Sequence, residues 1–210
     1  MCFRLNYFII FISVILILAP YSIAQEIENL LSNPDFERDT NGWTLGMGNI
    51  LAIDFDEECP TETNVAKVAI ETVGAEGWEP ELHSPSFALA NGKTYTYSFW
   101  AKTEPEETKE IHPMFESNDP AWAGAGGITV NLTDEWQEYH STAAWTNEDR
   151  PTVVIHIGLN YPPTEMVDMW ITHAKAYEGS YVEEEIEVLK TKAVTPVGSL
   201  AVSWGKIKSR

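Results

Sequence analysis

The sequence is poor in basic residues. Among 210 residues there are 13 Lys and Arg against 32 Asp and Glu, a formal net charge of −19. Such a surface repels the phosphates of nucleic acids and the anionic headgroups of membranes, so neither is expected as a partner. The 44% hydrophobic and 11% aromatic content argues equally against a disordered chain. What remains is an acidic, aromatic-rich globular domain.

A long apolar segment is also missing. The longest run, from Tyr7 to Ala19, has 13 residues, whereas a bilayer-spanning helix needs about 20. It follows Arg4 and leads to Pro20 and the small-residue exit at 22–24. This layout predicts a secretory signal peptide over residues 1–24, with an uncleaved anchor as the alternative. The mature protein is therefore expected to begin at Gln25 and to be secreted, or held at the cell surface.

Cysteine occurs only twice, at Cys2 and Cys59. Because Cys2 lies in the predicted signal peptide, the mature chain cannot form an intrachain disulfide, and its fold must depend on a hydrophobic core. Cys59 is flanked by acidic residues that disfavour its thiolate, which predicts a loop thiol rather than a nucleophile. The spacings C-x-x-C, H-E-x-x-H and G-x-S-x-G are absent from the sequence.

The body of the chain, residues 25–182, is patterned for β-strands. In Lys93–Ala101, Tyr95, Tyr97 and Phe99 alternate with polar residues and Trp100, the two-residue period of a strand with two different faces. Further strands are predicted at 50–55, 65–72, 127–132, 136–144, 153–160 and 166–177. Short strands separated by Gly, Pro and Asn predict an all-β fold, an antiparallel β-sandwich of the jelly-roll type.

Four segments carry a family resemblance. They are NLLSNPDFE at 29–37, NGW at 41–43, LANGKTYTYSFWAK at 89–102 and DEWQEY at 134–139. In this order they resemble the carbohydrate-binding modules of the family 4/9 (CenC) type, over about residues 29–179. The resemblance implies a galactose-binding-like jelly roll that binds polysaccharide without cleaving it, at most as an accessory module of glycoside hydrolases.

Two tryptophans are candidates for stacking on a sugar ring, whose C–H face packs against an indole. Trp78 lies where related modules carry a Trp followed three residues later by a polar side chain, so the resemblance implies Trp78 as the platform and Glu81 as a hydroxyl acceptor. Trp122 lies in a glycine-rich loop of the kind that often carries recognition. The alternative for both is a packed or loop-anchoring role.

The remaining binding candidates are Trp100, Glu116 and His156. Either Trp100 or the opposite face of its strand (Tyr95, Tyr97 and Phe99) is expected to line the groove, since one face must be core. Glu116 and His156 are predicted to hydrogen-bond sugar hydroxyls, with a solvated surface position as the alternative. Trp43 and Trp136 belong to the structural motifs and are expected in the core.

A structural calcium ion is a further implication of the resemblance. Family members hold it through the Glu of the opening motif, here Glu37, and an Asp near the last strand. Thr172 stands at the Asp position in this sequence. Because calcium prefers carboxylate ligands, the substitution weakens this prediction.

The charge is distributed unevenly along the chain. Residues 25–187 hold seven basic and all 32 acidic residues, whereas 188–210 hold five basic residues and no acid. Residues 183–210 are therefore predicted to be a linker and tail, with docking onto the acidic body or recognition by an export or surface-attachment apparatus as the alternative. The acidic body favours a neutral polysaccharide of the β-glucan or xylan class over one rich in uronic acids. The competing hypothesis is an adhesion or structural sandwich without a groove, which burial of both Trp78 and Trp122 would favour.

Overall fold

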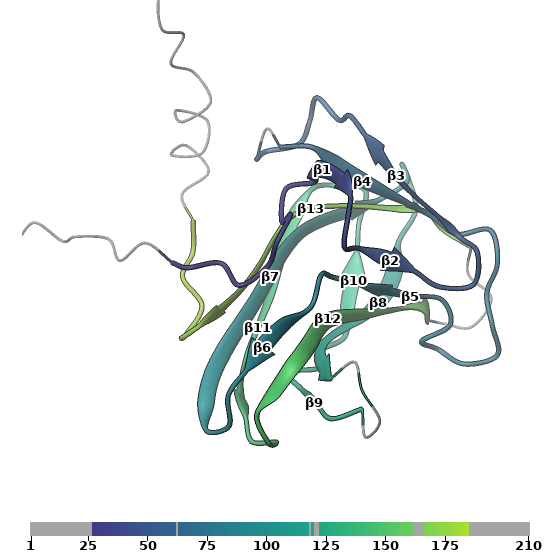
Figure 1. Cartoon of the computed structure of the whole chain (residues 1–210). Helices are drawn as coiled ribbons and strands as arrows, with labels where there is room; N and C mark the ends of the chain where they lie inside the picture. The colour runs from purple at the N-terminus through teal and green to yellow at the C-terminus, as the bar shows by residue number, and fades with distance from the viewer. Residues whose placement is uncertain (1–26, 62, 118, 120–121, 162–165, 185–210) are drawn as a thin grey trace, which may run out of the picture.

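The computed structural model describes residues 27–61, 63–117, 119, 122–161 and 166–184. This part of the chain folds into two antiparallel β-sheets that pack face to face (Figure 1). Among the described residues there is no helix long and apolar enough to cross a membrane. The predicted signal peptide (1–24), residues 25–26 and the chain from 185 onward lie outside them.

The first sheet has five strands. Their order is β11 (Gln137–Trp145), β7 (Lys93–Thr103), β13 (Met169–Glu178), β4 (Val65–Ala69) and β3 (Ile50–Asp54). Strand β1 (Glu37–Thr40) precedes them along the chain.

The second sheet has seven strands. Its main order is β10 (Val130–Leu132), β8 (Lys109–Ser117), β12 (Arg150–Tyr161), β5 (Glu81–His83) and β2 (Thr44–Leu45). Two short strands complete it: β6 (Phe87–Leu89) pairs with β12, and β9 (Gly124–Ala125) pairs with β8. The predicted all-β antiparallel sandwich is thus confirmed.

The predicted strands are present, some with different ends. Strand β4 ends at Ala69 rather than 72, because the next backbone amides leave the sheet for side-chain acceptors. The amide of Ile70 donates to Asp168 Oδ1 (2.9 Å), and those of Glu71 and Thr72 donate to Asn49 Oδ1 (2.7 and 2.8 Å). Strand β8 was not expected, since Pro113 and four charged or histidine residues obscure its alternation of buried and half-buried positions.

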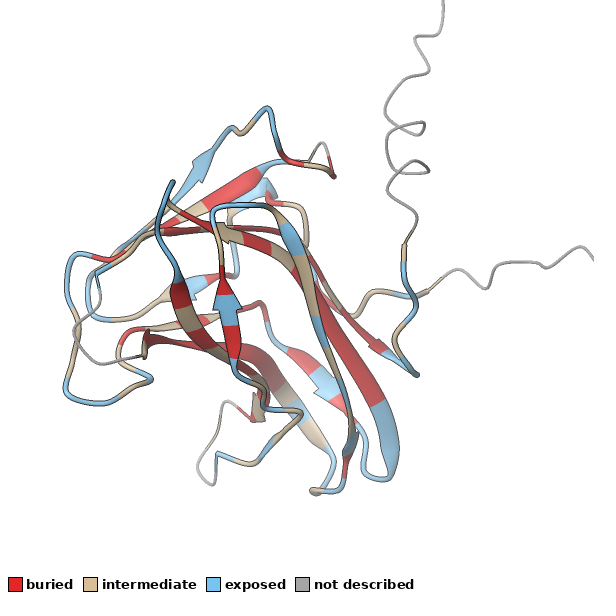
Figure 2. Ribbon diagram, turned by 180° about the vertical axis from the view of Figure 1, so that it is seen from behind, coloured by how far each residue is buried: buried red, intermediate tan, exposed pale blue. Residues whose placement is uncertain are grey.

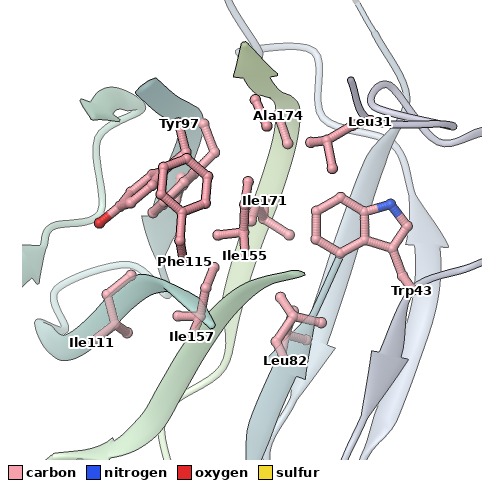
Figure 3. Close-up of a cluster of buried hydrophobic side chains, with 14 of the residues drawn as sticks. Leu31, Trp43, Leu82, Tyr97, Ile111, Phe115, Ile155, Ile157, Ile171 and Ala174 are labelled. Carbon is pink, nitrogen blue, oxygen red and sulfur yellow. The ribbon is translucent and has the colours of Figure 1, made fainter. Parts of the chain in front are cut away.

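The core fills the space between the sheets, and its buried positions appear in red in Figure 2. Tyr97 of β7 meets Phe115 of β8, with ring centres 5.0 Å apart, beside Ile155 and Ile157 of β12 (Figure 3). These side chains and that of Phe99, also on β7, are almost fully buried. The Tyr97 hydroxyl lies 2.8 Å from the carbonyl oxygen of Pro113 in the facing sheet, which satisfies its polar atom inside the core. The aromatic face of β7 is therefore core.

The two motif tryptophans differ in burial. Trp43 is buried as expected, and its Nε1 donates to the Asn33 carbonyl (3.1 Å). The expectation for Trp136 was wrong, because this residue is half-buried on the outer face of the five-stranded sheet. Its Nε1 donates to Asp56 Oδ2 (3.2 Å), and Lys102 Nζ lies 5.4 Å from its ring centre. These charged partners hold the indole on the surface.

An ionic cluster ties the opening segment to the last strand. His173 Nδ1 lies 2.7 Å from Asp35 Oδ1, and its Nε2 lies 2.9 Å from Glu184 Oε2. Burial acts to lower the pKa of His173, but hydrogen bonds to both carboxylates outweigh it and raise the pKa to about 8. Hydrogen bonds from His173 and Lys175 lower the pKa of Glu184 to about 2, against the opposing effect of burial.

The Phe99→Ala substitution should cost about 3–5 kcal/mol in the free energy of unfolding, because it opens a cavity in the core. Phe55, which is 79% exposed, provides the matched control, and Phe55→Ala should change stability by less than about 0.5 kcal/mol. Urea denaturation measures both. Equal effects of the two substitutions would contradict the assigned core.

The His173 cluster predicts a loss of stability at alkaline pH. Because the folded-state pKa of about 8 lies above the ordinary value of 6.5, the stabilisation is fully present below pH 6.5 and is lost as pH rises through 8. The expected loss is about 1–2 kcal/mol. His173→Asn, which tolerates the positive φ of this position, should flatten this part of the profile. An unchanged slope between pH 6.5 and 9 in the variant would refute the assignment.

Candidate functional site

A groove of about 810 Å³ lies on the outer face of the seven-stranded sheet, on the side away from the core. Strands β5, β8 and β12 supply its floor, and the segments around Trp78 and Trp122 add two exposed indoles. The polar side chains that line it are Glu81, His83, His112, Glu116, Thr129, His156 and Tyr161. The floor is therefore polar, and aromatic rings stand beside it.

The register of the strands determines which side chains meet on the floor. His156 of β12 lies between His83 of β5 and Met114 of β8, and Gly158 lies between Glu81 and His112 in the same way. In a strand, every second side chain points to the same face. These residues therefore share the groove face, while Ile155 and Ile157 point into the core.

Gly158 is the point where another segment crosses the floor. A Cβ atom there would lie 3.3 Å from Trp78 Cα and 3.0 Å from the Tyr161 ring. The absence of a side chain at Gly158 thus allows the backbone of the Trp78 segment to lie directly on β12.

The segment that carries Trp78 is attached to β12 through its backbone. Amides of Leu159 and Asn160 donate to the carbonyls of Pro80 (3.0 Å) and Gly77 (2.9 Å). The buried Asn160 side chain adds bonds from Nδ2 to the Gly74 and Glu76 carbonyls (3.2 and 3.0 Å). The main chain is thus fixed, while Trp78 remains 47% exposed at the groove.

Tyr161 and His112 form a stacked pair in the groove lining. Their rings are nearly parallel, with centres 3.6 Å apart, and His112 Nε2 lies 2.8 Å from Glu110 Oε1. The ring of Tyr161 also covers Gly77, where an added Cβ would lie 2.1 Å from Tyr161 Cε1. A side chain at Gly77 would therefore displace this pair.

The second exposed indole, Trp122, lies in the connection between β8 and β9. The Ser117 amide donates to the Ala123 carbonyl (2.8 Å), and the Ala123 amide donates back to Ser117 Oγ (2.9 Å). These bonds attach the end of the loop to β8. Trp122 is 60% exposed and lines the groove.

Two histidines and two carboxylates meet on the floor. His156 Nδ1 lies 3.2 Å from His83 Nε2, 3.8 Å from Glu81 Oε2 and 3.3 Å from Glu116 Oε1. Burial lowers the pKa of His83; Glu81 opposes this effect, and the adjacent His156 adds to it. The groove can thus offer both hydrogen-bond acceptors and donors to a ligand rich in hydroxyl groups.

Five of the six candidate binding residues line this groove: Trp78, Glu81, Glu116, Trp122 and His156. His156 is only 6% exposed, so it is not a solvated surface residue. Burial of both Trp78 and Trp122 would have favoured the competing hypothesis, and both are exposed. His83, His112 and Tyr161 were missed, because only the non-local pairing of β5, β8 and β12 reveals that they meet.

Trp100 lies elsewhere. It is on the outer face of the five-stranded sheet, where it lines a hollow of about 410 Å³ with Pro60 and Trp136. The face of β7 that Trp100 shares is turned away from the core, and the core separates it from the groove. Neither face of β7 therefore lines the groove.

The residues present do not fit a calcium ion. Glu37 is exposed, and the buried Thr172 offers a neutral hydroxyl that already donates to the Asn64 carbonyl. The nearby carboxylate of Asp35 is paired with His173. One unpaired carboxylate and one engaged hydroxyl are a poor donor set for this cation.

Comparisons with known proteins agree with this architecture. The family model described as a carbohydrate binding domain, CBM 4/9, matches residues 28–164. A solved family 4 carbohydrate-binding module is similar over 71% of this chain and 99% of its own, with a TM-score of 0.58 and 20% identity. A search among curated proteins finds no matching sequence.

Two further structures share the fold. The CBM22-1 xylan-binding domain from Paenibacillus barcinonensis Xyn10C matches over 74% of this chain and 97% of its own (TM-score 0.52, 14% identity). The N-terminal cellulose-binding domain of Cellulomonas fimi β-1,4-glucanase C matches over 67% and 91% (TM-score 0.50, 17% identity). The family match covers well over half of the sequence, and this chain belongs to the CBM 4/9 family of non-catalytic carbohydrate-binding domains.

Proposed function

We propose that the groove on the seven-stranded sheet binds a chain of neutral polysaccharide, of the β-glucan or xylan class. The observation that carries this proposal is the placement of two exposed indoles, Trp78 and Trp122, beside a floor of carboxylates and imidazoles. A pyranose ring has the matching chemistry, because its C–H face packs on an aromatic ring and its hydroxyls hydrogen-bond to polar side chains.

The preorganised backbone supports this function. The Trp78 segment is fixed to β12 by four hydrogen bonds, and the Trp122 loop is attached at Ser117. Fixing the aromatic platforms before binding reduces the entropy lost when a sugar chain docks. The floor residues lie on strands, so their positions are also set before the ligand arrives.

Charge narrows the class of ligand. Residues 25–187 carry seven basic against 32 acidic residues, and the groove itself contains Glu81 and Glu116. A polymer rich in uronic acids would meet like charges both at long range and on the floor. A neutral chain avoids this repulsion, and its hydroxyls can donate to the carboxylates.

An extracellular site of action follows from the predicted signal peptide at 1–24. The domain would then meet polysaccharide outside the cell, as a secreted or surface-held protein. Recognition of the basic segment 188–210 by an export or surface-attachment apparatus is compatible with this role. Both segments lie outside the described residues.

Trp78→Ala should weaken glycan binding by more than about tenfold while leaving the fold intact. We expect the unaltered protein to bind soluble glucan or xylan with a Kd of about 10 µM to 1 mM, or −4 to −7 kcal/mol. Losing one stacked indole should remove about 1.5–3 kcal/mol of binding free energy. A loss of this size raises the Kd by more than about tenfold. Affinity electrophoresis and calorimetry, with a uronic-acid polymer as the comparison ligand, measure the effect.

Trp100→Ala is the matched control, since this residue also exposes part of an indole but lies on the other sheet. It should leave glycan affinity unchanged. No retardation of the unaltered protein on any plant or algal polysaccharide would refute the proposed function. Equal losses in the two variants would refute the location of the groove.

Gly77→Ala tests the shape of the groove lining. The new methyl group would overlap the Tyr161 ring, so we expect a cost of about 1–3 kcal/mol in stability together with weaker glycan binding. Gly127→Ala is the control, because its Cβ would make an ordinary contact at 3.7 Å with Met114 Cβ in the same groove. Denaturation measures the stability of both variants, and calorimetry measures their glycan affinity. If Gly77→Ala changed both quantities as little as Gly127→Ala, the result would contradict this geometry.

A further inference from the structure

The cluster of Glu81, His83 and His156 has the geometry of a metal site. The three ligand atoms His83 Nε2, His156 Nδ1 and Glu81 Oε2 are 3.2, 3.6 and 3.8 Å apart in pairs. A tetrahedral Zn²⁺ ion with bonds of about 2.0–2.1 Å separates its ligand atoms by about 3.3 Å. The observed triangle is thus close to one face of such a tetrahedron, and small side-chain rotations would complete it.

The backbone holds these ligands in place. His83 of β5 and His156 of β12 are directly opposite each other on paired strands. Two residues away on each strand, Glu81 lies opposite Gly158. All three therefore come from the centre of a sheet rather than from mobile loops. His156 is 6% exposed, and the His83 side chain is 14% exposed. Sites built on strands keep their ligand geometry better than sites built on loops.

The donor set selects the type of ion. Two imidazole nitrogens and one carboxylate favour zinc and related divalent transition metals, whereas calcium and magnesium prefer oxygen ligands alone. Among the described residues this is the one group of three such side chains whose ligand atoms all lie within 4.8 Å of one another. The sequence does not reveal it, because His83 and His156 are 73 residues apart and the three ligands follow no metal-binding spacing.

We propose that Glu81, His83 and His156 form a binding site for one divalent transition-metal ion. Three protein ligands leave a fourth position open, as in zinc sites that accept water or a ligand. All three residues line the groove, so the open position faces it. Glu116 Oε1, 3.3 Å from His156 Nδ1, is placed to accept a hydrogen bond from a molecule bound there. The site does not depend on whether the groove binds a glycan.

Calorimetric titration of the metal-depleted full chain with ZnCl₂, in the absence of any sugar, tests this proposal. We expect one Zn²⁺ per chain with an affinity in the micromolar range or tighter. His83→Gln and Glu81→Gln should each weaken binding by at least about tenfold. His140→Gln is the control, since His140 is exposed on β11 of the other sheet.

Titration with Co²⁺ supplies a second readout that does not depend on heat. A cobalt ion held by two nitrogens, a carboxylate and solvent should give the visible absorption of a four-coordinate complex, and His83→Gln should remove it. Circular dichroism verifies that each variant is folded, and Glu81→Gln keeps the side-chain shape. The absence of zinc binding, or equal loss in His83→Gln and His140→Gln, would overturn the proposal. Because no glycan is present, either result leaves the proposed polysaccharide binding to be judged by its own experiment.

Discussion

The alternation of side chains along β12 is the constraint on which the rest of the structure depends. Ile155, Ile157 and Leu159 point into the core, while His156 and Gly158 face the groove. A slip of one residue in register would exchange these two sets and place His156 among the core side chains. The pairing that closes the hydrophobic core therefore also assembles the floor of the groove.

Local pattern was enough to predict much of the fold. The alternation of Tyr95, Tyr97 and Phe99 marked β7, and the four ordered motifs indicated the family. Strand β8 escaped prediction because its outward positions carry His112 and Glu116 and Pro113 interrupts its buried face. Its alternation becomes evident only when β10 and β12 are known to flank it.

Some residues of the groove could be predicted individually, but their assembly could not. The family resemblance implied Trp78 and Glu81, the glycine-rich loop indicated Trp122, and hydrogen-bonding chemistry made Glu116 and His156 candidates. The contact between His83 and His156 depends on the pairing of β5 with β12. The stacking of Tyr161 on His112 depends on the position of the last residue of β12 beside β8. These contacts join parts of the chain far apart in sequence, so no local pattern encodes them.

The tryptophans show why aromatic content alone is a poor guide to binding. On the five-stranded sheet, Trp136 and Trp170 donate their Nε1 protons to Asp56 and Asp54, and Lys102 Nζ lies within 6 Å of both ring centres. Those indoles stabilise a charged outer surface. Trp78 and Trp122 instead line the hollow of the other sheet, where a sugar ring can reach them.

The central claim is that glycan binds on the outer face of the seven-stranded sheet. The most direct measurement is an NMR titration of the backbone and indole amides with a soluble cello- or xylo-oligosaccharide. The account predicts that shifts concentrate in β5, β8 and β12 and at the indoles of Trp78 and Trp122. Shifts centred on Trp100, Trp136 and Trp170 would contradict it.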